Sequence, residues 1–100
     1  MILMEMGQHI RRNNNMLYLI NYDLHSPGTN YDLLIGAIQS YQNWAKISRS
    51  CWMVRCDSTA TEIRDHLMRY LDQNDILLVC SVDSWATLNV NQEVITWLSN

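Results

Sequence analysis

The spacing of hydrophobic positions changes along the chain, and it predicts strands that alternate with helices. Residues 16–23 are largely apolar on both faces of an extended chain, which is typical of a central strand. A turn-forming Ser-Pro-Gly sequence follows. A helix is then expected over residues 31–41, because Leu34, Ile38 and Tyr41 lie at the spacing of one buried helical stripe.

Residues 44–56 alternate as an extended chain does, with a polar stretch inside the segment. The polar stretch favours a bend, which would divide the segment into a short strand near residues 45–48 and a longer strand near residues 50–56. One long strand is the alternative interpretation of the same pattern.

The second predicted helix begins at a capping box. Thr59 and Glu62 have the spacing at which each side chain bonds the backbone N–H of the other, and an apolar stripe continues the helix over residues 60–71. A polar segment ends this helix. Residues 76–82 then form a nearly continuous apolar run, which predicts a second central strand. Near the end of the chain, Asn91 is placed to cap a short terminal helix.

This order of elements predicts an α+β fold of the ferredoxin-like class, a split βαβ sandwich in which two helices cover one face of an antiparallel sheet. One hundred residues with 48% hydrophobic content fit a single domain, and so small a core often gains stability from a homodimer. We assign residues 1–15 to a flexible N-terminal extension and residues 16–90 to the ferredoxin-like domain. Residues 91–100 form a C-terminal tail or short helix.

The composition narrows the classes of function. The formal net charge is -3, with seven Lys and Arg residues, so the sequence lacks the strong positive charge of a duplex-binding protein. No apolar run approaches the roughly 20 residues that span a bilayer, and no membrane partner is expected. The three cysteines form no CxxC pair and cannot all pair with one another. A cytoplasmic protein with reduced thiols in core or interface positions is therefore expected.

Asp23 is the first candidate functional residue, because it brings a carboxylate to the end of the first strand. Hard divalent cations such as magnesium prefer carboxylate oxygen, and a bound cation can activate water and neutralise phosphate charge. His25 is a candidate general base or phosphate contact, and Ser26 is a candidate hydrogen-bond donor to phosphate. The alternative for these three residues is a solvated turn in which Asp23 caps the backbone.

Arg49 and Ser50 form a second candidate group for phosphate binding, at the start of the middle strand. An arginine can bind a phosphate through two parallel hydrogen bonds, and the alternative is surface charge that protects a sheet edge. His66 has no HxxxH companion, which favours a structural role. Core or dimer packing is favoured over base stacking for the four tryptophans, which are Trp44, Trp52, Trp85 and Trp97.

Three short motifs carry a resemblance to a known family. They are Tyr22-Asp23-Leu24 at the end of the first strand, Ser50-Cys51-Trp52 in the middle of the chain, and Asp72-Gln-Asn-Asp75 before the last apolar run. In this order and spacing they resemble the small CRISPR-associated Cas-two-like proteins, and more narrowly the SinR-like branch. The helical segment Ile63-Arg-Asp-His-Leu67 is also similar to that branch, and the resemblance covers residues 16–82.

The resemblance implies a ferredoxin-like homodimer in which the two copies of Asp23 face one another near the interface and bind magnesium for phosphodiester hydrolysis. It also implies a nucleic-acid-linked role, with RNA or DNA as partner, in a defence or mobile-element setting. Hydrolysis is not universal in that family, in which the protein can act as a structural bridge instead. Toxin ribonucleases of the VapD type share the general architecture. A noncatalytic module that binds a protein or a nucleotide stays open as the alternative.

Overall fold

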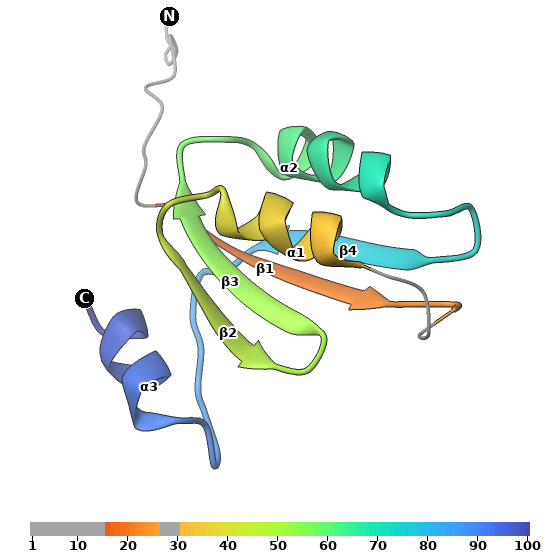
Figure 1. The fold of residues 1–100 in the computed structure, drawn as a ribbon. Coiled ribbons are helices and arrows are strands. Elements are labelled where there is room, and N and C mark those ends of the chain that lie inside the picture. Colours follow the sequence, from red (N-terminus) through yellow and green to blue (C-terminus); the bar gives the residue numbers. More distant parts are fainter. Residues whose placement is uncertain (1–15, 27–30) are drawn as a thin grey trace, which may run out of the picture.

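The computed structural model describes residues 16–26 and 31–100, and the extension expected over residues 1–15 lies outside the described residues. Within the described ranges, the chain forms a small α+β structure with four strands and three α-helices (Figure 1). In sequence order the elements are β1 (Met16–Asp23), α1 (Asp32–Gln39), β2 (Trp44–Ser48), β3 (Cys51–Cys56), α2 (Ala60–Leu67), the 3-10 helix η1 (Met68–Tyr70), β4 (Ile76–Ser81) and α3 (Gln92–Leu98).

The four strands form one antiparallel sheet in the order β2-β3-β1-β4. Helices α1 and α2 cover one face of this sheet (Figure 1). The arrangement is compatible with the ferredoxin-like fold that the order of elements predicts. The central position predicted for residues 16–23 is confirmed, because β1 pairs with β3 on one side and with β4 on the other.

β4 is an edge strand, so the prediction of a second central strand over residues 76–82 is wrong. Leu77 and Val79 pack against the core beneath the helices. Ile76 and Leu78 alternate with them, and their exposed fractions are 62% and 54%. The apolar run therefore reflects one buried face and one exposed apolar face, rather than two buried faces. An exposed hydrophobic face of this kind is typical of a contact surface.

Residues 44–56 form a hairpin, which confirms the predicted bend. β2 and β3 pair with a register shift near the end of β2, and Arg49 and Ser50 form the turn between the two strands. Ser50 therefore lies in the turn and not in the strand expected over residues 50–56. The strand begins one residue later, at Cys51.

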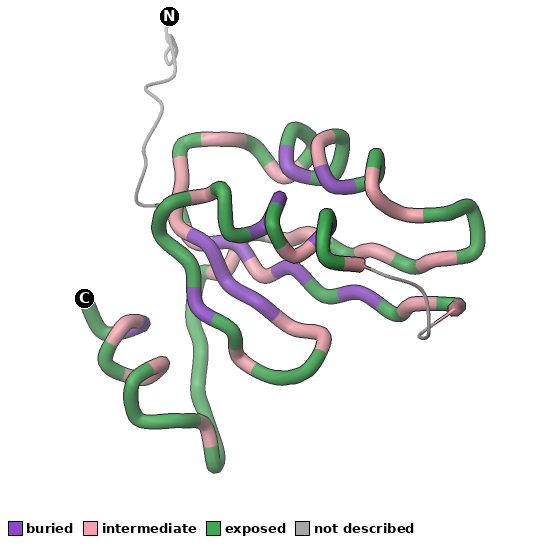
Figure 2. The backbone as a smooth tube through the Cα atoms, in the orientation of Figure 1, coloured by how far each residue is buried: buried purple, intermediate pink, exposed green. Residues whose placement is uncertain are grey.

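The hydrophobic core lies between the sheet and helices α1 and α2 (Figure 2). Strand alternation places Tyr18, Ile20 and Tyr22 of β1 on this face. Trp52 of β3 is 2% exposed and donates its indole N–H to the Tyr22 hydroxyl at 3.0 Å. This hydrogen bond gives the buried polar group of each side chain a partner in the core. The other buried members of this cluster are Leu34, Ala37, Ile38, Val54, Ile63 and Leu67.

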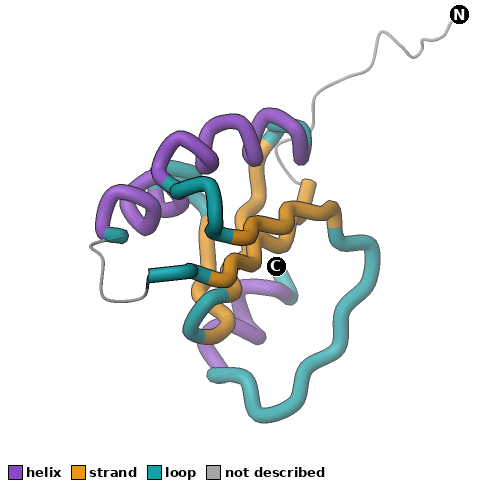
Figure 3. The backbone as a smooth tube through the Cα atoms, turned by 90° about the vertical axis from the view of Figure 1, so that its right-hand side faces the viewer, coloured by secondary structure: helices purple, strands orange, loops and turns teal. Residues whose placement is uncertain are grey.

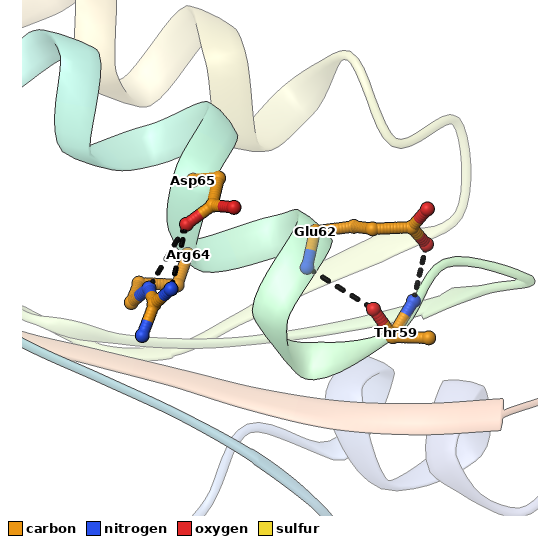
Figure 4. Close-up of polar contacts among 4 residues, drawn as sticks. All are labelled: Thr59, Glu62, Arg64 and Asp65. Carbon is orange, nitrogen blue, oxygen red and sulfur yellow. Dashed lines mark hydrogen bonds and ion pairs between the residues drawn. The ribbon is translucent and has the colours of Figure 1, made fainter.

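The capping box predicted at the start of α2 is confirmed (Figure 4). The Glu62 N–H donates to the Thr59 hydroxyl oxygen at 3.1 Å, and the Thr59 N–H donates to the Glu62 carboxylate at 2.8 Å. The span predicted over residues 60–71 is divided between α2 and the 3-10 helix η1 that follows it. On the exposed side of α2, Arg64 and Asp65 form an ion pair at 2.8 Å, a surface contact that contributes little to stability.

Helix α3 lies beside β2, on the side of the sheet away from α1 and α2 (Figure 1, Figure 3). Asn91 caps this helix as predicted, because its side-chain oxygen accepts from the Glu93 N–H at 2.7 Å. At the other end, the Arg55 guanidinium donates to the carbonyl oxygens of Trp97 and Leu98, each at 2.9 Å. Leu98 is buried. Apolar burial and a cation at the helix C-terminus therefore both hold α3 on the sheet.

Residues 82–91 connect β4 to α3 without forming a strand. Their side chains are mostly exposed, and Trp85 and Leu88 have exposed fractions of 39% and 85%. In the part of the chain that the structure describes, no helix combines the length and apolar character needed to cross a membrane.

Candidate functional site

The predicted site residues gather at one end of the sheet, which faces the viewer in Figure 3. Because β1 is antiparallel to both of its neighbours, its last residues lie opposite the first residues of β3 and β4. Asp23 pairs with Ile76, and the Tyr22 N–H donates to the Ser50 carbonyl oxygen at 3.1 Å. The structure therefore brings to this end the segments that carry Asp23, His25, Ser26, Arg49 and Ser50.

Asp23 is the exposed last residue of β1, and alternation directs its side chain to the face of the sheet opposite the core. Its cross-strand neighbour Ile76 and the nearby Leu78 lie on the same face and are exposed. The candidate metal ligand therefore lies at the rim of an exposed apolar surface. We call this surface the open face, and its members are Leu19, Asn21, Asp23, Cys51, Ile76, Leu78 and Cys80.

One chain supplies few metal ligands at this position. Among the described residues, no three His, Cys, Asp or Glu side chains are grouped so that they could hold a metal ion. Asp23 offers one carboxylate, and Asn21 on the same face offers an amide oxygen, both of which suit magnesium. A magnesium site at Asp23 therefore needs further oxygen atoms from a second copy of the chain or from a bound phosphate.

Asp75 fastens the loop after β1 to the start of β4. Its carboxylate accepts from the His25 backbone N–H at 2.8 Å and from the Asp72 N–H at 2.9 Å. The Tyr31 hydroxyl donates to the same carboxylate at 3.2 Å. Asp75 thus links the loop that carries His25 and Ser26 to the beginnings of α1 and β4.

These contacts set the pKa of Asp75. Desolvation raises the pKa of its carboxyl group, but hydrogen bonds from Asp72, His25 and Tyr31 together lower it by more, so the pKa lies below its ordinary value of 3.8. Desolvation, followed by the hydrogen bond to Asp75 and its charge, raises the pKa of the Tyr31 hydroxyl. At neutral pH, Asp75 is therefore a charged acceptor and Tyr31 a neutral donor.

The sequence pattern does not point to Asp75 as part of the site. Its segment predicts the end of a helix and belongs to the motifs of the resemblance, but neither gives Asp75 a role. A local signal exists: the Asp72 side chain accepts from the Asn74 N–H at 2.8 Å, as in an Asx turn before a strand. The bonds to His25 and Tyr31 join residues 50 and 44 positions apart. No periodicity or short motif encodes a contact over that separation.

We expect Asp75→Asn to destabilise the protein at neutral pH and to have a smaller effect in acid. Because the folded-state pKa of Asp75 is depressed, its carboxylate stabilises the fold above the unfolded-state pKa, near 3.8, and this contribution is lost as pH falls through the folded-state pKa. Asparagine keeps the size of the side chain without its charge. Urea unfolding measures the free energy of unfolding of both proteins. The difference between the two values should begin to shrink as pH falls below about 4. A constant difference down to about pH 2 would contradict a role for the charge.

The second candidate group lies in the turn of the hairpin. Arg49 is exposed there, and Ser50 is partly buried beside it. The Ser50 carbonyl oxygen accepts from the Tyr22 N–H, which joins the turn to the end of β1. The side chains of Arg49 and Ser50 are the candidate contacts to phosphate. Their place at the same end of the sheet as Asp23 keeps them within the candidate site.

A separate polar cluster surrounds His66 on α2. Its Nδ1 atom lies 2.7 Å from the Tyr41 hydroxyl oxygen, and its ring meets the rings of Tyr41 and Tyr70 edge to face, with centroids 5.4 and 6.0 Å apart. Burial raises the pKa of Tyr41 to about 12, so its hydroxyl stays protonated. The aromatic packing supports the structural role predicted for His66.

The three cysteines are free thiols at partly buried positions. Burial is the main cause that raises the pKa of Cys51, and Cys80 adds to the effect. Burial also raises the pKa of Cys56. A thiol with a raised pKa forms little nucleophilic thiolate at neutral pH, so Cys51 and Cys56 are not part of the candidate chemistry.

Comparison with known proteins identifies no family for this chain. No family model matches the chain, and a search of the curated proteins returns no match. The class of protein is therefore defined by the fold and the site alone. It is a small α+β protein whose antiparallel sheet has two helices on one face and an acidic residue at the rim of its exposed apolar face.

Proposed function

We propose that the protein is a Cas-two-like homodimer with a nucleic-acid-linked role in a defence or mobile-element setting, and that it hydrolyses phosphodiester bonds with magnesium. The dimer forms through the open faces of two copies. Asp23 of each copy binds the metal. The side chains of His25, Ser26, Arg49 and Ser50 are the candidate contacts to the phosphate of RNA or DNA.

One observation carries this proposal: Asp23 shares its face of the sheet with the exposed side chains of Ile76 and Leu78. Full burial of an aliphatic side chain of this size contributes about 1.5–3 kcal/mol, so contact between two open faces has a hydrophobic driving force. A two-fold interface uses the same patch on both copies. Both Asp23 residues then belong to one interface, which supports a metal site shared between copies.

The residues around Asp23 have distinct roles in this scheme. Magnesium, when bound, supplies a polarised water and neutralises phosphate charge. His25 can accept a proton or donate a hydrogen bond, and Asp75 fixes the backbone from which it projects. Arg49 can bind two phosphate oxygens through its guanidinium group. Ser26 and Ser50 can each donate a hydroxyl hydrogen bond.

Leu78→Glu should convert the dimer into a monomer. The substitution places a carboxylate on the open face, and an unpaired charge is costly to bury in an apolar interface. Sedimentation velocity over a range of protein concentrations measures the change in mass. Leu33→Glu is the matched control, because Leu33 is 74% exposed on α1, away from the open face. A wild-type protein that stays monomeric at every concentration would remove the physical basis of the shared metal site.

A noncatalytic interaction module is the second candidate function. It is favoured by the edge position of β4, since an edge strand can pair with an extended segment of a protein partner. Binding of a protein, a nucleotide or a nucleic acid would then be insensitive to EDTA. A dimer that binds nucleic acid but leaves it intact with magnesium present would support this candidate over hydrolysis.

A further inference from the structure

Strand β2 leaves one edge of the sheet open. Antiparallel strands exchange hydrogen bonds at every second residue, and the Arg55 N–H donates to the Asn43 carbonyl oxygen at 2.9 Å just before β2. The next residue of β2 that faces β3 in this way is Ala45. The N–H and C=O groups of Trp44 and Lys46 therefore point away from β3. In the described part of the chain no strand pairs with that side of β2, so this edge can accept an added strand.

A hollow of about 390 Å³ adjoins this edge on the side of helix α3, which is the neighbour of β2 in Figure 1. Trp44 and Lys46 border the hollow from the strand edge, while their side chains lie near Trp52 on the other face of the sheet. Because strand side chains alternate, Ala45 is the residue between them that projects toward α3. The helical wall of the hollow consists of Asn91, Glu93, Val94 and Trp97.

Contacts with the sheet hold the helical wall in place. The Arg55 guanidinium donates to the carbonyl oxygens of Trp97 and Leu98, and its central carbon lies 4.4 Å from the centre of the Trp97 ring. The Trp97 indole N–H donates to the Asn43 side-chain oxygen at 2.7 Å. The position of this ring is therefore set before a ligand arrives, which lowers the entropic cost of binding.

The residues along the edge define the side chains that suit an added strand. Directly opposite residues of two paired strands project on the same face. A side chain opposite Ala45 enters the hollow, where the small alanine leaves room and where Val94 and Trp97 offer apolar contacts. A side chain opposite Lys46 lies beside an exposed ammonium group, which favours a carboxylate. An apolar side chain opposite Trp44 meets an indole that is 38% exposed.

We propose that the edge of β2 and the adjoining hollow bind an extended peptide segment of a partner protein. The segment pairs antiparallel with β2, the more stable of the two directions, and places an acidic, a large aliphatic and an apolar residue opposite Lys46, Ala45 and Trp44. Backbone hydrogen bonds supply affinity, and the alternate side chains supply specificity. The surface lies on the sheet edge opposite β4 and does not include Asp23, so this interaction goes beyond the magnesium-dependent function.

Fluorescence anisotropy with the labelled heptapeptide Thr-Thr-Glu-Leu-Val-Thr-Thr tests this proposal. In the proposed register the Val N–H points toward β2 and the Leu N–H points away. N-methylation of the Val amide should weaken binding at least about fivefold, because it leaves a strand carbonyl without its hydrogen bond. N-methylation of the Leu amide is the matched control and should have little effect. Ser in place of Leu should weaken binding about 10-fold or more, because the apolar contact in the hollow is lost.

Lys46→Glu tests the charge at the same edge. The substitution should weaken binding of the Glu-Leu-Val peptide by about 2- to 30-fold, because a like-charge pair replaces an opposite-charge pair across the strands. A peptide with Lys in place of Glu should bind this variant more tightly than it binds the wild type. Arg69→Glu is the matched control, since Arg69 is exposed in η1 and lies outside the hollow. It should leave the affinity for both peptides unchanged.

Several outcomes would overturn the proposal. They are absence of binding of the parent heptapeptide up to about 1 mM, equal weakening by the two N-methyl groups, and self-association that Lys46→Glu abolishes and Leu78→Glu does not, which would assign the edge to a second copy. The peptide variants leave the protein unchanged, so their effects cannot arise from misfolding. The titrations are made in EDTA and use no nucleic acid. Their failure is therefore distinguishable from failure of the proposed nuclease activity.

Discussion

Asp23→Asn should reduce magnesium-dependent cleavage of RNA or DNA by about 10²-fold or more. A metal ion stabilises the charge of a phosphoryl transition state by several kcal/mol, and each 1.36 kcal/mol changes the rate tenfold. Asparagine preserves the size of the side chain and removes the charge that holds the cation. In a dimer with a shared site, one substitution removes both carboxylates at once. Single-turnover cleavage of end-labelled RNA and DNA, with and without EDTA, gives the rate constant.

The matched control for this experiment is Asp83→Asn. Asp83 is an exposed aspartate in the connector after β4 and is not a member of the open face. Its substitution should leave the cleavage rate unchanged. Equal cleavage by wild type and Asp23→Asn would eliminate the aspartate mechanism, whatever the oligomeric state. Sedimentation velocity on Asp23→Asn would show whether a loss of rate arises from loss of the dimer.

Ile20→Ala should destabilise the fold by about 2–5 kcal/mol. Ile20 has no exposed surface and lies in the central strand between Trp52 of β3 and Val79 of β4. Truncation removes the buried side chain and leaves a cavity that the surrounding strands and helices can fill only in part. A domain of this size has a total stability of about 5–15 kcal/mol, so the loss is a large share of it. Urea unfolding followed by far-ultraviolet circular dichroism measures the change.

Leu33→Ala is the control for the core substitution. Leu33 is 74% exposed on α1, and a surface substitution of this kind usually changes stability by about 0.5 kcal/mol or less. Both substitutions shorten an aliphatic side chain to alanine, and the two positions differ in burial. A loss of stability at Ile20 no larger than at Leu33 would contradict the assignment of the core.

The elements that could be predicted from the sequence are those with strong local signals. The capping box at Thr59 and Glu62 marks the start of α2, and the polar stretch within residues 44–56 marks the hairpin. Helix α1 was expected over residues 31–41 and spans Asp32–Gln39, a difference confined to its frayed ends. The apolar run of residues 76–82 could not by itself show that β4 lies at the edge of the sheet, because the sequence does not distinguish an apolar residue on an open face from one in a core.

In the candidate site, too, some features follow from the sequence pattern and others arise only from tertiary contacts. Antiparallel pairing follows from the predicted fold, so the meeting of Asp23 with the hairpin turn could be expected from the order of elements. The role of Asp75 could not be predicted, because its partners His25 and Tyr31 come within hydrogen-bond distance only in the formed sheet. The docking of α3 on the sheet is likewise a tertiary feature. No local sequence pattern specifies the position of this short helix.

The hydrogen bond between His25 and Asp75 has a consequence for how an anion could bind beside β1. The His25 backbone N–H already donates to the Asp75 carboxylate, so this amide is not available to an anion as the amides of a backbone nest are. An anion bound by His25 must therefore be held by its imidazole. Its affinity should change when the His25 side chain is substituted.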